Sequence, residues 1–528
     1  MVRGTPQILP GTWRGTIRRM VEGWFHGRVA CGEPPPPPPR GVPAPRAGKD
    51  RKALLLAFLL TAACSGPPPE DTGPLVVSAI GGSLAEGDPM RGPIDAARAT
   101  YLAATAEGLV SFDAAGGIVP ALAERWIVSD DGLSYIFRLR RSGTAGPPID
   151  AETAAKYLRR AIEKNGRNPL KPVLGAIDEI VAMPNDVVEI RLVGPRPNLL
   201  QILAQPELAI VKDGAGAGPF AAKPLWDTAA RLTLVAQPGN EGPWPRAILL
   251  HGDTAGRAVA RYTQGGADLV IGGRFTDLPV LQQVKLAPDV LHFDPVEGLF
   301  GLAIVSDAGF LASPANRAAL VNAIDRDRLV AALPAPGWRT QMRIVPSGMP
   351  DLPAPEAARP SPQEKAAGVA AAREAVQRWL TDGGAMTPLR IALPPGPGAT
   401  LLYAQLALQW RAIGVPLVRV GWDEDADLRL IDEVAPADNA AWYLRHFACE
   451  ANPVCDAEAD AALIAARRAP SLEERQRQLA IADARLAGII PFVSIARPLR
   501  WSLAPRLLRG FATNVRGVHP LAPLVAPQ

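Results

Sequence analysis

The chain of 528 residues has few of the residues that mark common active sites, with only five histidines and four cysteines. No two histidines form an HExxH pair, and the sequence has neither the G-x-S-x-G turn of α/β-hydrolases nor a P-loop. The formal net charge is only +4, and lysine and arginine form no long block. This pattern does not indicate nucleic-acid binding. We predict a protein that is not an enzyme, with a secreted hydrolase as the enzymatic alternative.

Long apolar stretches are also missing, because no segment of the sequence reaches the roughly 20 apolar residues that span a bilayer. Proline, in contrast, is abundant, with 56 residues. The uninterrupted run Pro34–Pro39 is expected to be extended and cannot join a core. We interpret residues 1–52 as a low-complexity leader, which an over-extended translation start would explain. The rest of the chain is long enough for two or three domains.

A basic segment is followed by an apolar one, residues 53–63, and then by Cys64. This order is typical of a signal peptide, with residues 53–63 as its apolar h-region. Leu60–Cys64 resembles a bacterial lipobox, so we predict that Cys64 carries lipid and that residues 64–74 form a flexible tether. The protein would then be anchored to a membrane in the periplasm or at the cell surface. The alternative is an ordinary signal peptide or membrane-anchored N-terminus with an incidental cysteine.

Local patterns further along predict alternating strands and helices. Apolar residues alternate with polar ones from Leu133 to Leu139, which indicates a half-buried strand. Asp150 stands where a helix N-cap belongs, and apolar residues follow it at helical spacing. Residues 361–364 read as a capping box before another helix. The succession of such elements predicts an α/β fold.

Four short motifs follow one another in the first half of the chain: Glu107–Leu109, Pro120–Trp126, Asp131–Leu133 and Asp150–Glu152. Their order resembles that of the family 5 extracellular solute-binding proteins, which serve ABC importers of peptides and nickel. The family's Phe-x-Asp-Gly turn, expected before the helix at Asp150, is missing from residues 142–148. Two further matches lie far along the chain, at residues 317–326 and 510–520.

The resemblance implies a two-lobed periplasmic-binding-protein fold of the α/β class, with mixed sheets and a ligand cleft between the lobes. Lobe 1 would comprise residues 75–300, lobe 2 residues 301–490, and a C-terminal segment, residues 491–528, would return to lobe 1. A monomer without a cofactor would capture a small solute, a short peptide, and deliver it to an ABC permease and ATPase complex. The alternatives are a sensor or scaffold lipoprotein without transport, and a receptor for nickel or a metal chelate.

The resemblance also suggests ligand-binding residues. Ser83 and Leu84 match the start of the family's Ser-Leu-Asp-Pro loop, which lies close to ligand. In peptide-binding relatives, an aspartate of a Trp-x-Ala-Asp-Tyr stretch pairs with the α-ammonium group of the ligand. A gapless alignment places Pro436 at that position. The candidate anchors are therefore the neighbouring acids, with an aromatic ring to stack on the solute; the alternative is that the acids form a solvated loop. These candidates are Asp432, Glu433, Asp438 and Trp442.

One group of residues has the types that bind zinc: His446, Cys449, Cys455 and Asp456. Their spacing matches no familiar zinc pattern, so we predict no metal site. In an exported protein, two cysteines this close favour a disulfide, which we predict between Cys449 and Cys455. Free thiols and a metal site are the alternatives.

Overall fold

The computed structural model describes residues 73–84, 89–140, 145–163, 165–235, 247–333, 335, 337–353 and 359–525. All of them belong to one compact unit that begins at Asp71. The predicted leader, the signal segment, Cys64 and the tether as far as residue 72 lie outside the described residues. Among the described residues, no helix combines the length and apolar character that crossing a membrane requires.

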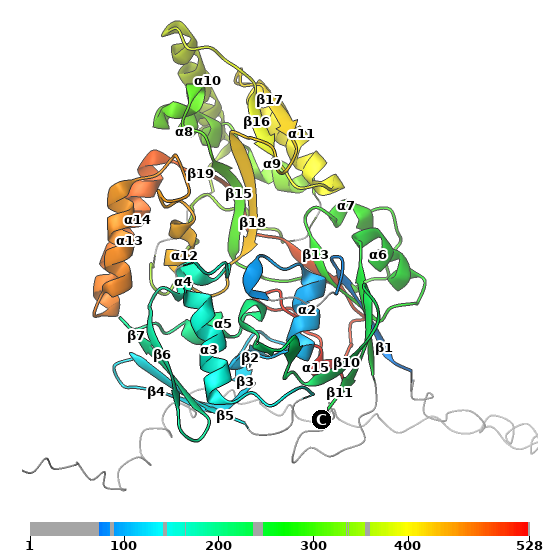
Figure 1. The fold of residues 1–528 in the computed structure, drawn as a ribbon. Coiled ribbons are helices and arrows are strands. Elements are labelled where there is room, and N and C mark those ends of the chain that lie inside the picture. The colour runs from blue at the N-terminus through cyan, green and yellow to red at the C-terminus, as the bar shows by residue number, and fades with distance from the viewer. Residues whose placement is uncertain are drawn as a thin grey trace, which may run out of the picture. The chain divides into compact units, whose positions relative to one another are not determined.

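The largest sheet has seven strands in the order β10-β11-β12-β1-β13-β20-β14 (Figure 1). Its three central strands, β12, β1 and β13, are parallel, and the outer strands join them antiparallel. Helices α2 (Ala96–Thr105) and α6 (Ala255–Thr263) pack against the parallel strands. The strands are β1 (Leu75–Ile80), β10 (Phe220–Trp226), β11 (Ala229–Leu234), β12 (Ile248–Asp253), β13 (Leu269–Arg274), β14 (Leu291–Phe293) and β20 (Arg500–Leu503).

A four-stranded antiparallel sheet, in the order β4-β5-β7-β6, holds the first region that resembles the family. The predicted strand is confirmed as β5 (Ser134–Leu139), whose Tyr135, Phe137 and Leu139 are buried. The predicted helix is confirmed as α3 (Ala151–Ile162), because the Asp150 carboxylate accepts a hydrogen bond from the Thr153 amide at 2.8 Å. The other strands are β4 (Ala123–Val128), β6 (Ile177–Met183) and β7 (Val187–Leu192).

The third large sheet is mixed and has five strands, in the order β17-β16-β18-β15-β19. All seven residues of its inner strand β15 are buried, between β18 and β19. The predicted capping box is confirmed at the start of α10: the Glu364 amide donates to Ser361 Oγ at 3.2 Å, and the Ser361 amide donates to Glu364 Oε2 at 2.7 Å. The strands are β15 (Gly298–Ile304), β16 (Leu389–Ala392), β17 (Leu417–Val420), β18 (Leu428–Val434) and β19 (Phe492–Ala496).

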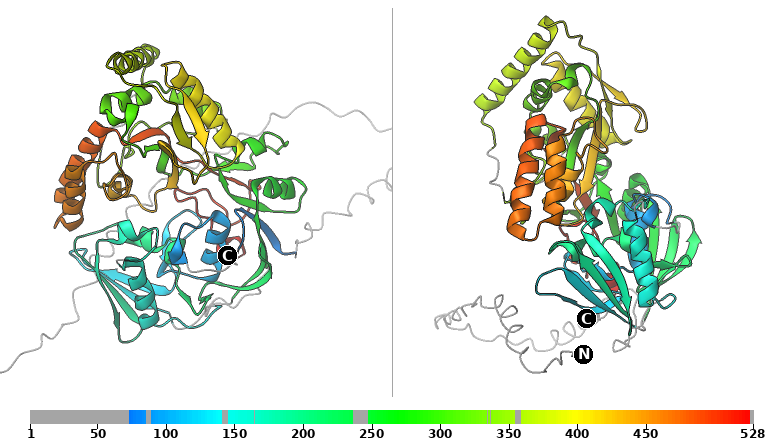
Figure 2. Two further views of the ribbon diagram at one scale, coloured as in Figure 1. Left: turned by 45° about the horizontal axis from the view of Figure 1, so that its top comes forward. Right: turned by 60° about the vertical axis from the view of Figure 1, so that its left-hand side comes forward.

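Helices pack on both faces of the five-stranded sheet, in two separate apolar clusters. Figure 2 shows α13 and α14 side by side, as an antiparallel pair. One cluster contains α8 (Pro314–Asn322), α9 (Arg326–Ala331), α10 (Pro362–Thr381) and α11 (Pro397–Arg411). The other contains α12 (Ala440–Arg445), α13 (Ala457–Arg468) and α14 (Leu472–Ile489).

Short elements complete the fold. The last helix, α15, lies against the seven-stranded sheet, because Leu521 and Val525 are buried in the same apolar cluster as β1. The short elements are η1 (Pro89–Arg91), β2 (Val110–Phe112), β3 (Ile118–Pro120), α4 (Lys171–Leu174), α5 (Leu199–Leu203), η2 (Pro206–Leu208), β8 (Val211–Lys212), β9 (Ala215–Gly216), α7 (Leu278–Leu281), η3 (Gly309–Ala312) and α15 (Ala522–Val525).

The chain passes directly between the seven-stranded and five-stranded sheets at two places, from β14 to β15 and from β19 to β20. The boundary predicted after Phe300 falls inside β15, and the one predicted after Ile490 falls just before β19. Both strands pair within the five-stranded sheet, so the chain passes between the two sheets at residues 294–297 and 497–499, and the predicted lobe bounds stay a prediction. Phe275, which follows β13, packs edge-on against Phe300 of β15, with ring centroids 4.8 Å apart.

Candidate functional site

The carboxyl ends of β1, β12 and β13 meet at one edge of the seven-stranded sheet, because the three strands are parallel neighbours. In open α/β sheets, ligands bind outside this edge. The edge is closely packed at Gly272, where an added Cβ would lie 2.4 Å from the Cβ of Ala96 and 3.2 Å from the carbonyl oxygen of Ile80. The beginning of α2 therefore sits directly against the ends of β1 and β13.

Ser83 and Leu84 follow β1 at this edge. Ser83 Oγ donates to the carbonyl oxygen of Asp227 at 3.1 Å, and the Leu84 amide donates to the same oxygen at 2.7 Å. Leu84 is buried in the apolar cluster of the seven-stranded sheet. Its side chain therefore stabilises the sheet, and the ligand contact predicted for these two residues stays a prediction.

Asp432, near the end of β18, is bound by two arginines of the seven-stranded sheet. Arg274 donates from Nε to Oδ2 at 3.1 Å, and Arg500 donates from Nη1 to Oδ1 at 2.8 Å. Both guanidinium groups also donate to the main-chain oxygen of Asp432, at 2.8 and 3.2 Å. Burial alone would raise the pKa of Asp432, but Arg500 and Arg274 hold it below its usual value. The Asp432 side chain is only 5% exposed, so it is a structural anion that links two sheets.

Glu433, the next residue of β18, pairs with His446 just after α12. His446 Nε2 lies 3.1 Å from Glu433 Oε2, and His446 Nδ1 lies 2.8 Å from the carbonyl oxygen of Trp442. Because both ring nitrogens face acceptors, the protonated imidazolium is favoured. Burial opposes this, yet the Glu433 carboxylate and the Trp442 carbonyl raise the pKa of His446.

Trp442 is mostly covered by its neighbours. Its ring meets the Tyr443 ring edge-on at 4.8 Å and the His446 ring edge-on at 4.5 Å, and only 8% of the residue is exposed. Little of the indole face is therefore available for the predicted stacking on a solute, which stays a prediction.

Asp438 lies in the loop between β18 and α12, which is held by residues of lobe 1. Its Oδ2 accepts from Arg516 Nη2 at 2.8 Å and from Gln201 Nε2 at 3.2 Å. Gln205 Nε2 donates to the carbonyl oxygen of Pro436 at 2.7 Å. Each of the three predicted acids thus has a cationic partner within the protein. A ligand ammonium group would have to share or displace that partner, and the predicted anchor stays a prediction.

The structure joins Cys449 and Cys455 in a disulfide, with the Cα atoms 5.0 Å apart. The zinc alternative has no support, because both sulfur atoms are used, His446 Nε2 faces Glu433, and Asp456 is paired with Arg485 at 2.8 Å. The described part of the chain contains no group of three or more metal-ligating side chains.

Sequence reasoning missed a second polar cluster at the junction of the sheets. Glu297, just before β15, pairs through Oε1 with Arg497, which follows β19. Glu297 Oε2, Tyr443 Oη and Arg516 Nε are buried and make no hydrogen bond to any described residue. Burial raises the pKa of Tyr443 strongly, so its hydroxyl stays protonated. No sequence signal singles out these residues, because they lie far apart in the chain.

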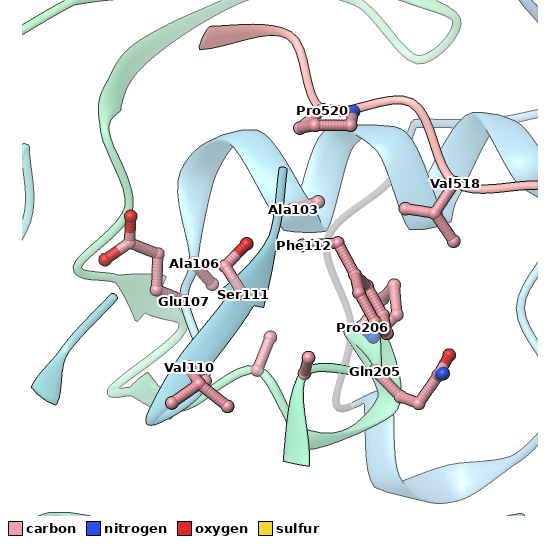
Figure 3. Close-up of a pocket in the computed structure, with 13 residues that line it drawn as sticks. Ala103, Ala106, Glu107, Val110, Ser111, Phe112, Gln205, Pro206, Val518 and Pro520 are labelled. Carbon is pink, nitrogen blue, oxygen red and sulfur yellow. The ribbon is translucent and has the colours of Figure 1, made fainter. Parts of the chain in front are cut away.

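Two cavities lie within lobe 1, and neither is lined by a predicted ligand-binding residue. The first, of about 20 Å³, is lined by α2, β2, the connection from α5 to η2, and the C-terminal segment (Figure 3). Its volume suits about one water molecule. The second, of about 590 Å³, lies beside α2, β9 and the beginning of β10, and its rim at Ala145 adjoins residues outside the described range.

A family model described as bacterial extracellular solute-binding proteins, family 5 Middle, matches residues 117–418, which is more than half of the chain. The chain belongs to this family. Residues 117–418 include the four-stranded sheet, strands β15 and β16 of the five-stranded sheet, and the beginning of β17. The family predicted from the sequence is confirmed.

Solved structures of family members share the fold. A periplasmic oligopeptide-binding protein of Borrelia burgdorferi, OppAIV, superposes with a TM-score of 0.70 at 19% identity, covering 85% of this chain and 99% of that one. The murein tripeptide binding protein MppA of Escherichia coli gives a TM-score of 0.72 at 17% identity, covering 85% and 97%. The predicted two-lobed α/β fold with mixed sheets is confirmed.

A curated relative matches over a shorter stretch. The nickel-binding periplasmic protein of Escherichia coli is 32% identical over 102 residues, which is 19% of this chain and 20% of the relative. The match thus spans about a fifth of that relative's length.

Proposed function

We propose that this family 5 protein is the solute-binding component of an ABC importer and captures a small solute between its two lobes. The observation that carries the proposal is the family match, which runs from the four-stranded sheet of lobe 1 to the five-stranded sheet of lobe 2. The carboxyl edge of the parallel strands, facing Asp432 of the other sheet, gives such a solute a place to bind.

The solute that we favour is a short peptide. The structural neighbours reported above are an oligopeptide-binding and a murein tripeptide-binding protein. Charged side chains of both signs surround the junction of the sheets, including Arg274, Glu433 and Asp438. Such a set suits a ligand with an ammonium group at one end and a carboxylate at the other.

Nickel is the second candidate solute, because the curated relative is a nickel-binding protein. A bare metal ion would find no group of three ligating side chains among the described residues. A metal held in an organic chelate would not need one, so the metal-chelate alternative is tested together with peptides.

The delivery of the solute is also part of the proposal. The protein would be exported, carry lipid on Cys64, and act as a monomer that presents its solute to a membrane permease and its ATPase. It would catalyse no reaction, in agreement with a family described as solute-binding. A sensor or scaffold lipoprotein would share the binding but lack the uptake.

The test is binding, followed by uptake. Mixtures of di- to pentapeptides, and separately a nickel–histidine chelate, are titrated into the purified protein while its thermal unfolding is followed. Peptides at concentrations well above Kd should raise the midpoint temperature of unfolding by several degrees, because the ligand binds only the folded state. No shift with peptides at millimolar concentration contradicts the peptide assignment. If the purified protein binds a peptide but a strain that lacks the protein still takes up that peptide normally, the sensor or scaffold alternative is favoured.

A further inference from the structure

One turn of lobe 1 exposes an apolar side chain between two arginines. The Leu508 amide donates to the carbonyl oxygen of Pro505 at 3.0 Å, which places Arg506 and Leu507 at the corner of a β-turn shortly after β20. Leu507 is 90% exposed, the largest value of any large hydrophobic residue that the structure describes. Arg506 and Arg509, on either side of the two leucines, are also exposed. Such a side chain is unusual unless something outside the chain covers it.

This segment, residues 505–510, is called the Arg-Leu turn, and its inner side is held firmly. Leu508 packs against the apolar cluster of the seven-stranded sheet. Gly510 has a φ of +77° and lies against α15, where an added Cβ would come within 2.1 Å of the carbonyl oxygen of Pro523. Only glycine fits such a position. Because the chain around it is fixed, Leu507 cannot turn inward without breaking these contacts.

The Arg-Leu turn lies at the edge of the sheet where the parallel strands begin, which we call the amino edge. β20 runs antiparallel to β13, and β13 runs parallel to β1, so the end of β20 and the start of β1 share this edge. Leu75, the first residue of β1, is buried in the same apolar cluster that Leu508 contacts. Figure 1 shows α15, which belongs to this cluster, on the side of lobe 1 that faces away from the five-stranded sheet.

The predicted tether joins the protein at the same edge. Ten residues, 65–74, separate Cys64 from Leu75. Ten residues span at most about 35 Å when fully extended. A lipid on Cys64 would therefore keep the amino edge within that distance of a membrane surface. Tethering raises the local concentration of the surface, so even a weak contact would be populated.

An anionic lipid surface matches both chemical features of the Arg-Leu turn. Each arginine close to such a surface strengthens the association about 5-fold. An exposed leucine between arginines can enter the boundary between headgroups and acyl chains. Within the protein, Arg506 is paired only loosely with Asp289, at 3.8 Å, and both side chains are more than two-thirds exposed. Exposed pairs of this kind are weak, so Asp289 does not prevent Arg506 from binding phosphate groups.

We propose that the Arg-Leu turn contacts the anionic lipid surface of the membrane in which the protein is anchored. The proposal rests on the lipid anchor proposed above and adds a preferred orientation of lobe 1. With the amino edge against the membrane, the proposed solute site at the carboxyl edge lies at the far end of the same strands, away from the lipid. The competing occupant of the two arginines is the acidic pair Glu70 and Asp71, which precedes β1 in the sequence.

The experiment measures hydrogen exchange in residues 505–510 of the lipid-bearing protein, reconstituted in vesicles. Vesicles of phosphatidylcholine alone are compared with vesicles of equal parts phosphatidylcholine and phosphatidylglycerol. The amides of the turn should exchange about 5- to 25-fold more slowly on the anionic vesicles, for one or two bound arginines. Added salt should remove most of this difference. Equal exchange on both vesicles at low salt would overturn the proposal and favour the acidic pair of the tether as the partner.

Two variants connect the effect to the turn itself. Leu507→Ser combined with Arg509→Gln should remove most of the difference between the two kinds of vesicle. Leu408→Ser combined with Arg411→Gln is the matched control, because it removes an exposed leucine and an exposed arginine from α11 of lobe 2. This control should keep the full difference. Full protection in the first variant, folded by circular dichroism, would refute the proposal.

A third variant should strengthen the contact. Asp289→Asn removes the acid beside Arg506, so the turn should be protected more strongly on anionic vesicles than in the wild type. Asparagine suits the position, because Asp289 has a φ of +60°, a left-handed conformation that asparagine adopts readily. Unchanged or weaker protection in this variant would contradict an electrostatic contact with the lipid.

If Cys64 proves to carry no lipid, the anchor of the proposed function fails on its own, in the fractionation. The same exchange measurement, with an excess of anionic vesicles added to the purified protein, then decides about the turn. Protection that the Leu507→Ser/Arg509→Gln variant loses would still support a membrane-binding turn. Exchange that the vesicles do not change would overturn it.

Discussion

Arg274 and Arg500 are cross-strand neighbours in the seven-stranded sheet, and both donate to one carboxylate of the five-stranded sheet, that of Asp432. Two adjacent guanidinium groups would repel each other without this anion. Both arginines also bind the main-chain oxygen of Asp432. The link therefore fixes the end of β18 relative to β13 and β20, at the level where a solute is proposed to bind.

Removal of this anion should destabilise the protein. We expect Asp432→Asn to lower the free energy of unfolding by about 3 kcal/mol, near the lower end of the cost of breaking a buried pair, because Arg274 is half-exposed and keeps water contact. Urea unfolding measures the difference. Glu473→Gln, which removes an exposed partner of Arg477, is the control and should cost less than about 1 kcal/mol. Equal costs for the two variants would contradict a linking role for Asp432.

Stability should also depend on pH through His446. Its pKa is raised in the folded state above the ordinary value of 6.5. The protonated form is therefore stabilised by folding, so its contribution is fully present below pH 6.5 and is lost as pH rises through the folded pKa. Urea midpoints of the wild type and His446→Gln, measured from pH 5.5 to 9, should differ most at the acid end. If the difference between the two midpoints grows toward alkaline pH instead, protonation of His446 does not stabilise the folded protein.

Single strands and helix starts could be predicted, because the sequence pattern that marks each of them spans only a few neighbouring residues. The alternation from Leu133 to Leu139 predicts β5, and Asp150 and the capping box at Ser361 predict the starts of two helices. Each signal depends on contacts that the chain makes with itself over one or two turns. The family is predicted from the order of the motifs between Glu107 and Glu152, and not from these local signals.

The site could be predicted only in part, because its contacts join residues far apart in the chain. Asp432 is separated from Arg274 by 158 positions and from Arg500 by 68. The sequence contains 56 lysines and arginines, so nothing marks these two as special. Its position four residues before Pro436 predicts that Asp432 is a ligand anchor. Its burial between two arginines follows from the packing of two sheets, which no local pattern encodes.

The disulfide is expected to stabilise lobe 2 modestly. It closes a loop of only six positions, from Cys449 to Cys455. The double variant Cys449→Ser/Cys455→Ser should therefore lower the free energy of unfolding by about 2 kcal/mol. A peptide map without reductant should find the two cysteines linked. If both thiols can be alkylated in protein purified under air, the predicted bond is absent, and stoichiometric zinc in the same sample would restore the metal alternative.

The lipid anchor can be tested by fractionation. Cys64 lies outside the described residues, so this prediction rests on the basic, apolar and small residues that precede it. The wild type should sediment with membranes and Cys64→Ser should not, since stable anchoring needs more than one acyl chain and lipoproteins carry several. Mass spectrometry should find no residue before Cys64 in the mature protein. Identical partitioning of the two forms would contradict lipidation.

Of the three predicted acids, Asp438 is the one that we expect to meet the ammonium group of a peptide. Asp432 is buried between two arginines, and Glu433 faces His446 beside α12. The Asp438 side chain is 43% exposed and lies in the loop between β18 and α12, where the Asp438 amide donates to Gln201 Oε1 of α5 at 3.0 Å. Its carboxylate has room to accept a further donor beside Arg516.

Asp438→Asn should therefore weaken the binding of peptides with a free N-terminus by about 10-fold, which corresponds to one charge-assisted hydrogen bond. The same peptides with an acetylated N-terminus should bind the wild type and the variant equally, because they carry no ammonium group. Glu473→Gln, which removes an exposed carboxylate of α14, is the control and should change neither affinity. Calorimetry with the two peptide forms measures all three proteins. If Asp438→Asn weakens acetylated and free peptides alike, Asp438 acts by holding Arg516 and its loop, and the ammonium group is bound elsewhere.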